Sequence, residues 1–235
     1  MLSGKAHALE GIAESASALV HAWLPGEEGG NAVADVLFGD YNPSGRLPVS
    51  LPRNAGQLST TTATPTTCET TTSTPPGDAL FPFGHGESYT DFAYSDLELS
   101  TEAVDTEGTD STVRVNVTVE NVVDRAGHEV VQWYTHDRHP PVARPVQQLR
   151  GFERVFLEAG ERARVEIELG VTQLAYLDSR ERLALHPDEY ELRVGHSAED
   201  VRASDRFEVT GKKRLLETGN RRLFSDVSFT AEPGR

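Results

Sequence analysis

The chain has 235 residues, of which 37% are hydrophobic, and it carries 37 acidic residues against 22 lysines and arginines. This length predicts one large domain or two modest ones. The formal net charge of -15 argues against nucleic acid and anionic membranes as partners, because like charges repel.

Residues 1–55 are predicted to alternate between strand and helix. Residues 1–4 are expected to be the end of a strand, and the apolar run at 17–22 is typical of a buried strand. A helix is predicted over 27–38, because two glutamates occupy its first turn and Gly39 is placed to end it. The apolar face of this helix is expected to hold Ala32, Val33, Val36 and Leu37, which recur at helical spacing.

Residues 56–80 are rich in Thr and Pro and nearly free of apolar side chains, which predicts a surface loop or linker. This stretch holds Cys68, the one cysteine of the chain, so no disulfide within the chain is expected. Residues 81–92 (FPFGHGESYTDF) form a connecting segment, in which we expect glycines to hold a turn above packed aromatic rings.

The hydrophobic period changes to two from about residue 93 onwards, as in antiparallel strands that bury one face. About six or seven such strands over 93–210 predict a β-sandwich of the immunoglobulin-like or fibronectin type III-like kind. The clearest alternating runs lie at 113–119, 127–135, 165–169, 190–194 and 206–210. Residues 211–235 carry a basic cluster and are expected to be a solvated C-terminal tail.

Four segments resemble a known family. They are AWLPGEEGGNAVADVLFGDYNPSGRLPVSLP at 22–52, FPFGHGESYTDF at 81–92, GHEVVQWY at 127–134 and RPVQQLRGFERVFLEAGE at 144–161. In this order and spacing they resemble the C-terminal part of glycoside hydrolase family 3, which contains the β-glucosidases. The resemblance implies an α/β plus all-β fold class: an incomplete C-terminal part of an α/β sandwich domain, followed by a fibronectin type III-like antiparallel β-sandwich.

The resemblance also implies a role in hydrolysing β-linked glycosides with retention, as part of a whole enzyme. In the family the nucleophile is an aspartate of an N-terminal barrel, and the acid/base is generally a glutamate upstream of the region matching Met1. We therefore assign no catalytic, cofactor-binding or metal-binding residue, and we expect the chain alone to be inactive. A truncated gene, a frameshift, a misassigned start codon, or a separately encoded N-terminal barrel half acting as partner would each account for this sequence.

Glu27 and Glu28 form a tempting carboxylate pair, because retaining glycosidases need two carboxyl groups about 5–5.5 Å apart. Neighbouring residues on a helix point about 100° apart, so these two acids do not converge on one bond. Acids in a first helical turn are also common, which favours a structural role. The nearby Gly26, Gly29 and Gly30 do not match a phosphate-binding glycine motif.

His85, Ser88 and Asp91 lie close enough in sequence to suggest a hydrolytic triad, but the serine lacks a nucleophile-elbow context. A glycine-held turn is the favoured interpretation. Glu87 departs from the family, which typically has an apolar residue at this position, and puts a charge at a site that is usually covered. Asn116 begins a glycosylation sequon within a predicted strand and receives little weight. No spacing of histidines matches a metal site.

The alternative from a different class is a free-standing fibronectin type III-like binding module. Such a module would present exposed aromatic rings in a row, whereas Trp23 and Trp133 occupy core-like contexts. No apolar run approaches the roughly 20 residues of a membrane helix, and no signal peptide is recognisable, so the default expectation is a cytoplasmic location. The acidic surface and the presence of only Lys5, Lys212 and Lys213 as lysines suggest a halophilic source.

Overall fold

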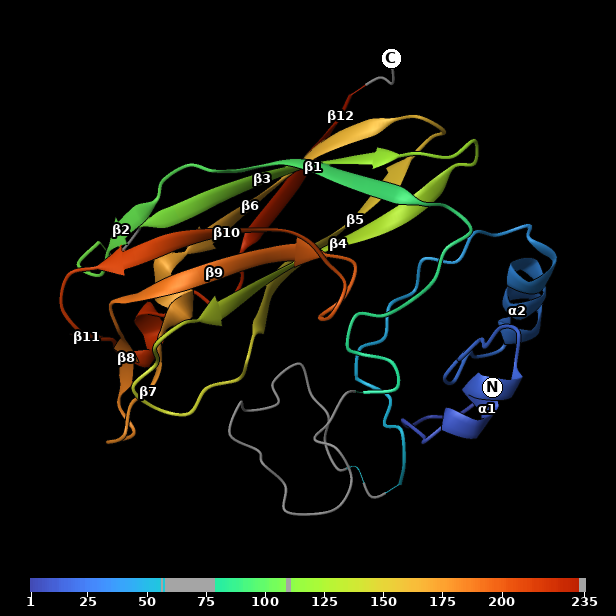
Figure 1. The fold of residues 1–235 in the computed structure, drawn as a ribbon, viewed down its shortest axis with the longest axis horizontal. Coiled ribbons are helices and arrows are strands. Elements are labelled where there is room, and N and C mark those ends of the chain that lie inside the picture. The colour runs from blue at the N-terminus through green and yellow to red at the C-terminus, as the bar shows by residue number, and fades with distance from the viewer. Residues whose placement is uncertain (56, 58–78, 109–110, 233–235) are drawn as a thin grey trace.

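The computed structural model describes residues 1–55, 57, 79–108 and 111–232. Most of them form a β-sandwich, and the N-terminal segment with both α-helices lies beside one end of it (Figure 1). Cys68 and nearly all of the Thr-rich stretch lie outside the described residues. Within the described part of the chain, no helix is long and apolar enough to cross a membrane.

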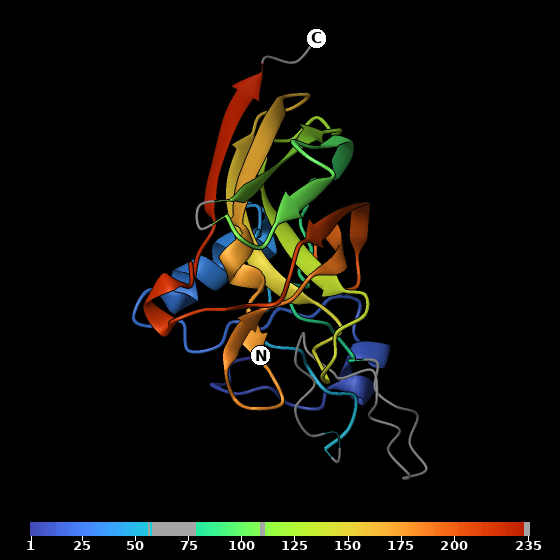
Figure 2. The ribbon, with the colours of Figure 1, turned by 90° about the vertical axis from the view of Figure 1, so that its left-hand side faces the viewer.

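The first sheet of the sandwich has the strand order β1-β3-β6-β12, and its neighbouring strands are antiparallel. The strands are β1 (Phe92–Leu99), β3 (Thr112–Asn121), β6 (Arg162–Gly170) and β12 (Asp226–Glu232). Seen from the side, β12 runs along the outer edge of the sandwich (Figure 2).

The second sheet has the strand order β2-β10-β9-β4-β5, in which only the β2–β10 pair is parallel. Its strands are β2 (Ala103–Asp105), β10 (Val201–Thr210), β9 (Asp188–Gly195), β4 (Gly127–Asp137) and β5 (Gln148–Leu157). A small third sheet and two short 3-10 turns lie in the connections. They are β7 (Tyr176–Leu177), β8 (Leu183–Leu185), β11 (Arg214–Leu215), η1 (Val171–Leu174) and η2 (Thr218–Asn220).

The core lies between the two large sheets. Every second residue of β3 from Val113 to Val119 is fully buried, and the β6 residues paired with them are buried too. Trp133 of β4 belongs to the same apolar cluster. The antiparallel sandwich predicted from the period of two is therefore confirmed.

The N-terminal segment contains α1 (Glu10–Ser15) and α2 (Gly29–Phe38). The second helix begins two residues later than predicted, and it ends where Gly39 adopts a left-handed φ of 84°. The apolar face predicted for this helix is only partly covered, and Leu37 on that face is 61% exposed. Phe38 beside it is 85% exposed, so the helix packs weakly against the rest of the described chain.

The two strands expected at 1–4 and 17–22 do not form. Instead, the two stretches lie side by side through three backbone hydrogen bonds: Met1 N donates to Val20 O at 2.6 Å, Ala22 N to Met1 O at 3.0 Å, and Ser3 N to Trp23 O at 3.1 Å. The two stretches run in the same direction, but these bonds do not follow the regular pattern of a parallel ladder. So short a pairing is marginal as a sheet.

Most of the described residues beyond 210 are exposed, as expected of a solvated tail, but much of this tail forms strands. Residues 214–215 form β11, and β12 pairs with β6 over seven residue pairs. The tail is held because Arg222 forms ion pairs with Glu168 and Asp226, and because Val227 packs against the core. The alternation of Val227 and Phe229 with polar residues is the signal that the sequence offered for this strand.

Candidate functional site

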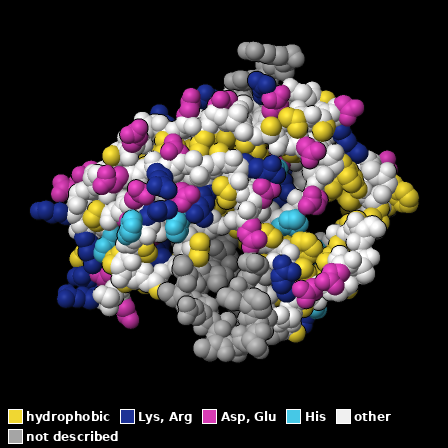
Figure 3. Space-filling view, viewed as in Figure 1, with side chains coloured by type: hydrophobic (Ala, Val, Ile, Leu, Met, Phe, Trp, Pro, Cys, Tyr) yellow, Lys and Arg dark blue, Asp and Glu magenta, His cyan; other side chains and the backbone are white. Residues whose placement is uncertain are grey.

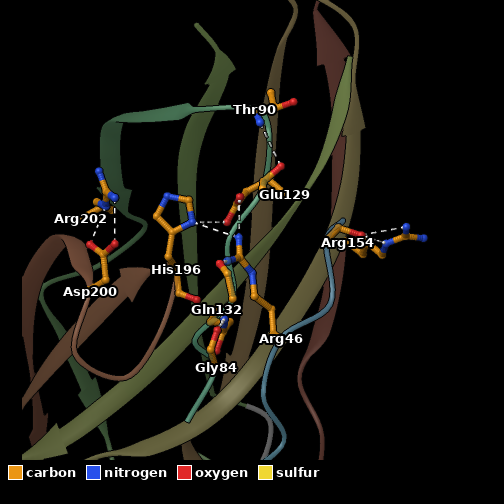
Figure 4. A network of polar contacts seen from close by, with 12 residues as sticks. Arg46, Gly84, Thr90, Glu129, Gln132, Arg154, His196, Asp200 and Arg202 are labelled. Carbon is orange, nitrogen blue, oxygen red and sulfur yellow. Dashed lines mark hydrogen bonds and ion pairs between the residues drawn. The ribbon is translucent and has the colours of Figure 1, made fainter. Parts of the chain in front are cut away.

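The N-terminal segment reaches the sandwich through two antiparallel stretches, 47–51 and 80–85. Leu47 N donates to His85 O at 2.8 Å and Gly84 N donates to Leu47 O at 2.8 Å, while Leu51 N donates to Phe81 O at 2.8 Å. This pairing fixes the FGHG turn next to Arg46. The turn and Arg46 then meet the start of β1, the start of β4 and the loop after β9 at one polar junction (Figure 4).

Glu129 is the centre of this junction. Its side chain is fully buried, and its carboxylate has three partners. Arg46 Nη2 lies 2.9 Å from Oε2, His196 Nδ1 lies 2.8 Å from Oε1, and the Tyr94 hydroxyl donates to Oε1 at 2.9 Å. Arg46 also donates to the carbonyl oxygen of Gly86 in the turn. The four side chains come from positions 46, 94, 129 and 196, so the junction joins distant parts of the chain.

His196 lies between the two charged members of this cluster. Its Nδ1 is 2.8 Å from Glu129 Oε1 and 3.2 Å from Arg46 Nη2. Burial, together with the negative charge of Glu129, raises the pKa of Tyr94 well above its usual value, so its hydroxyl stays protonated. Glu129 is therefore a buried anion whose charge is balanced by Arg46.

Gln132 extends the junction by a second layer of hydrogen bonds. Its Nε2 donates to Gly84 O at 3.2 Å and also to the carbonyl oxygen of His196, and its Oε1 accepts from the Tyr134 hydroxyl at 2.6 Å. Gly84 has a φ of +80°, and a Cβ at this position would collide with the Gln132 amide. The glycine is therefore required both for the turn and for its close approach to β4.

A second group of contacts continues the junction along the sandwich. Asn42 donates to Ala126 O at 3.2 Å and accepts from the Ser88 hydroxyl at 2.9 Å. Arg154 of β5 donates to Tyr41 Oη at 2.9 Å and Ser44 Oγ at 3.0 Å. These contacts attach residues 41–44 to β5, to the turn before β4 and to the connecting segment.

Glu27 and Glu28, the two acids considered as a catalytic pair, do not form a catalytic site in the structure. Glu27 and Glu28 are exposed and precede α2, and Glu28 accepts a hydrogen bond from Asn31 at 2.7 Å. Gly29 is buried against Pro25, where a Cβ would collide, so it serves packing. These residues form no phosphate-binding loop or carboxylate pair within the described structure.

His85, Ser88 and Asp91 do not form a hydrolytic triad either. Ser88 donates to Asn42 Oδ1, and the His85 ring stacks on Phe81 with centroids 5.0 Å apart. Burial lowers the pKa of His85. Glu87 lies 3.7 Å from His85 with its side chain 88% exposed, so the charge that departs from the family pattern is in contact with solvent. A turn over packed rings accounts for all of these residues.

Sequence reasoning missed Arg46, Glu129 and His196. One signal was available for Glu129, since the alternation of the predicted strand places it on the same inward side as Val131 and Trp133. A buried glutamate on such a strand requires a cation, but the sequence did not show which one. Arg46 is 83 residues away along the chain.

One surface cavity of about 550 Å³ lies on the loop between β4 and β5. Asp137 is its one carboxylate, and Arg144 binds this group at 3.1 Å. Burial raises the pKa of Asp137. A single, arginine-paired acid does not provide the two carboxyl groups of a glycosidase. Among the described residues, no group of three or more His, Cys, Asp and Glu residues is placed to hold a metal ion.

Comparison with known proteins matches two family models. The "Glycosyl hydrolase family 3 C-terminal domain" model matches residues 1–89, and the "Fibronectin type III-like domain" model matches residues 129–198. The chain therefore belongs to the C-terminal region of glycosyl hydrolase family 3. The buried junction joins the two matched regions, because Arg46 lies in the first and Glu129 and His196 lie in the second.

Several named proteins are similar to the chain. It is 37% identical to the periplasmic beta-glucosidase of Salmonella typhimurium, over 83% of this chain and 26% of that protein. It is 40% identical to the xylan 1,4-beta-xylosidase of Xylanibacter ruminicola, over 84% of this chain and 22% of that protein. The chain thus spans about a quarter of the length of these relatives.

Solved structures show the same likeness. A beta-glucosidase from Listeria innocua, in complex with isofagomine, aligns with a TM-score of 0.79 and 32% identity, over 90% of this chain and 30% of that one. A β-glucosidase from Erythrobacter marinus aligns with a TM-score of 0.80 and 37% identity, over 89% of this chain and 27% of that one.

Proposed function

We propose that the chain is the non-catalytic C-terminal part of a β-glucosidase-type enzyme that hydrolyses β-linked glycosides with retention. The observation that carries the proposal is the buried Arg46–Glu129 junction. This junction joins the N-terminal segment that carries Arg46 to the β-sandwich that carries Glu129, and we infer that the two move together as one unit. Relatives named as glucosidases and xylosidases support the class of substrate.

The arrangement of acids explains why catalysis is assigned elsewhere. The best-buried carboxylate, Glu129, is surrounded by a guanidinium, an imidazole and a phenol, and none of these is a second carboxyl group. Retention of configuration requires a carboxylate nucleophile and a separate acid. The chemistry is therefore proposed to reside in an N-terminal barrel, either in the same polypeptide or in a separate partner chain.

Hydrolysis of an aryl β-glucoside tests this proposal. The purified chain is expected to show no turnover, and turnover is expected when the chain is joined to, or mixed with, a family 3 N-terminal barrel region. Hydrolysis by the pure chain would contradict the proposal, and so would a joined protein that folds but stays inactive. The two tryptophans give no support to a free-standing binding module, because Trp133 is fully buried and Trp23 is partly buried.

We also propose that the protein is adapted to high salt. The support is the net charge of -15, whose self-repulsion is screened by molar salt. The free energy of unfolding in urea is expected to rise from low to molar potassium chloride. Equal stability across that range would refute the adaptation.

A further inference from the structure

An arginine without a carboxylate partner lies near the start of β5. Arg150 Nε donates to Thr135 Oγ1 at 2.7 Å, its Nη1 donates to Gln173 O at 3.0 Å, and its Nη2 donates to Gln148 Oε1 at 2.8 Å. All three acceptors are uncharged, and the guanidinium carries more N–H groups than these three bonds use. Arg150 therefore has donors to spare, and within the described residues no carboxylate touches it.

Two further arginines add to this positive charge. Arg144 Nη2 donates to the same Gln148 oxygen at 2.7 Å, and its Nε lies 3.1 Å from Asp137. Burial, together with the positive charges of Arg144 and Arg221, lowers the pKa of Arg150 to about 10, so Arg150 stays charged at neutral pH. In the described part of the chain, Asp137 is the one carboxylate in contact with any of the three arginines. Such an excess of charge is costly away from water.

Hydrogen-bond donors without partners border the same arginines. Gln173 is 3% exposed, and its Nε2 is buried with no partner in the described structure. Its Oε1 accepts from Ser225 Oγ at 3.0 Å and its backbone oxygen accepts from Arg150, so Gln173 lies between β5 and the 221–225 segment that leads into β12. Arg221 Nε in that segment is also buried and unpartnered. Both unmatched atoms are donors, so the group that would satisfy them is an acceptor.

The missing acceptor is expected to be small and negatively charged. A buried water molecule would satisfy the donors but would leave the charges of Arg150 and Arg221 unbalanced. The unmatched nitrogens of Gln173 and Arg221 are closed to solvent, which favours an ion of atomic size over a phosphate or a sugar. Lysine and arginine side chains also gather at the end of the sandwich that carries β8 and β11 (Figure 3). Such a concentration of charge attracts anions even though the chain as a whole is acidic.

We propose that Arg150, Gln173 and Arg221 bind a chloride ion between β5 and the 221–225 segment. The ion would tie the two large sheets together, because β5 belongs to one of them and the segment leads into β12 of the other. The site does not depend on where catalysis resides. It also differs from the screening effect proposed above, because a binding site saturates and depends on the identity of the anion.

The test is urea unfolding of the whole chain while potassium chloride replaces potassium gluconate at constant ionic strength. Screening is then the same in every sample, and gluconate is too large for a closed site. An ion that binds only the folded state raises the folding equilibrium constant about tenfold for each tenfold rise in chloride above its Kd. The wild-type chain is expected to show this dependence. Equal stability in the two salts would overturn the site.

Two neighbouring arginines provide a matched pair of variants. Arg221→Gln removes a charge that has no ion pair in the described structure, and it is expected to remove most of the chloride dependence. Arg222→Gln is the control, because Glu168 and Asp226 already balance the charge of Arg222. It should lower stability in both salts and keep the wild-type dependence on chloride. An undiminished dependence in Arg221→Gln, or its loss in Arg222→Gln alone, would overturn the proposal.

Crystals of the chain soaked in bromide give a direct measurement, since bromide replaces chloride and scatters X-rays anomalously. A peak is expected between Arg150 and Arg221 in the wild type and is expected to be absent from Arg221→Gln. No peak at this position would overturn the site. A peak in a protein whose stability ignores chloride would mark an adventitious ion only and reject the proposed role. Stabilisation by acetate but not by chloride would assign the donors to a carboxylate of another protein segment and overturn the choice of chloride.

Discussion

The guanidinium of Arg46 lies 2.9 Å from the carboxylate of Glu129, although 83 residues separate them in the chain. The Glu129 side chain is completely buried and that of Arg46 is 10% exposed. A buried pair of this kind contributes little when whole, yet loss of one partner leaves an unbalanced charge out of water. The mutational behaviour of the protein is expected to follow from that asymmetry.

Replacing Glu129 by Gln should destabilise the protein by about 3–5 kcal/mol, because Arg46 keeps its charge without a counterion. Urea unfolding at neutral pH measures the loss. The control is Glu98→Gln, which breaks the exposed pair with Arg164 and should cost less than about 1 kcal/mol. If the two variants lose equal stability, Glu129 is not the buried anion described here.

Replacing Gly84 by Ala should destabilise the protein by more than backbone strain alone accounts for. The new methyl group would meet the Gln132 amide at a φ of +80°. Gly160→Ala is the matched control, since Gly160 has a φ of +72° but open space around it. The strain shared by both changes is about 1 kcal/mol, and the excess in Gly84→Ala reports the contact with β4. Equal losses would show that the turn can move away from β4.

Acid should weaken the ion pair between Asp178 and Lys213. Hydrogen bonds from Lys213 and from the backbone of Arg182 hold the pKa of Asp178 well below its ordinary value of 3.8. A lowered folded-state pKa stabilises the fold above pH 3.8, and this stability is lost as the pH falls below that value. The stability gap between wild type and Asp178→Asn should therefore be full at pH 7 and narrow below pH 4. A gap that is constant from pH 7 to pH 2 would contradict this assignment.

Removing residues 221–235 should make the protein self-associate. Strand β6 would become an edge strand with unpaired backbone groups, and edges of this kind pair with other chains. Size-exclusion chromatography of the shortened chain is expected to show dimers or larger species. Arg222→Ala in the full chain is a milder test, because it removes ion pairs with Glu168 and Asp226 while keeping the strand. A monomeric shortened chain would show that β12 does not protect the sheet.

The sandwich was predictable from sequence because its signal is local. Val113 to Val119 alternate with polar residues, and each valine is buried in the structure. The strands expected at 1–4 and 17–22 failed for the opposite reason, since a strand needs neighbours that a short apolar run cannot supply. The end of α2 at Gly39 was predicted correctly because a glycine C-cap is again a local signal.

The junction escaped prediction because its members are far apart in sequence. Nothing near Arg46 indicates that it pairs with Glu129, or that His196 completes the set. The parity of Glu129 with Val131 and Trp133 was a usable signal for an inward glutamate, yet only the folded topology brings the cation to it. Long-range polar networks of this type therefore require coordinates.

The position of Glu129 also decides how the protein can be divided. A sandwich expressed from residue 93 onwards would keep the buried carboxylate but lose Arg46, and Gln132 would lose its contact with Gly84. The sequence boundary between the two family regions is thus not a place where the protein can be cut. A shortened protein that keeps both ionic partners of Glu129 must begin before Arg46 and extend beyond His196.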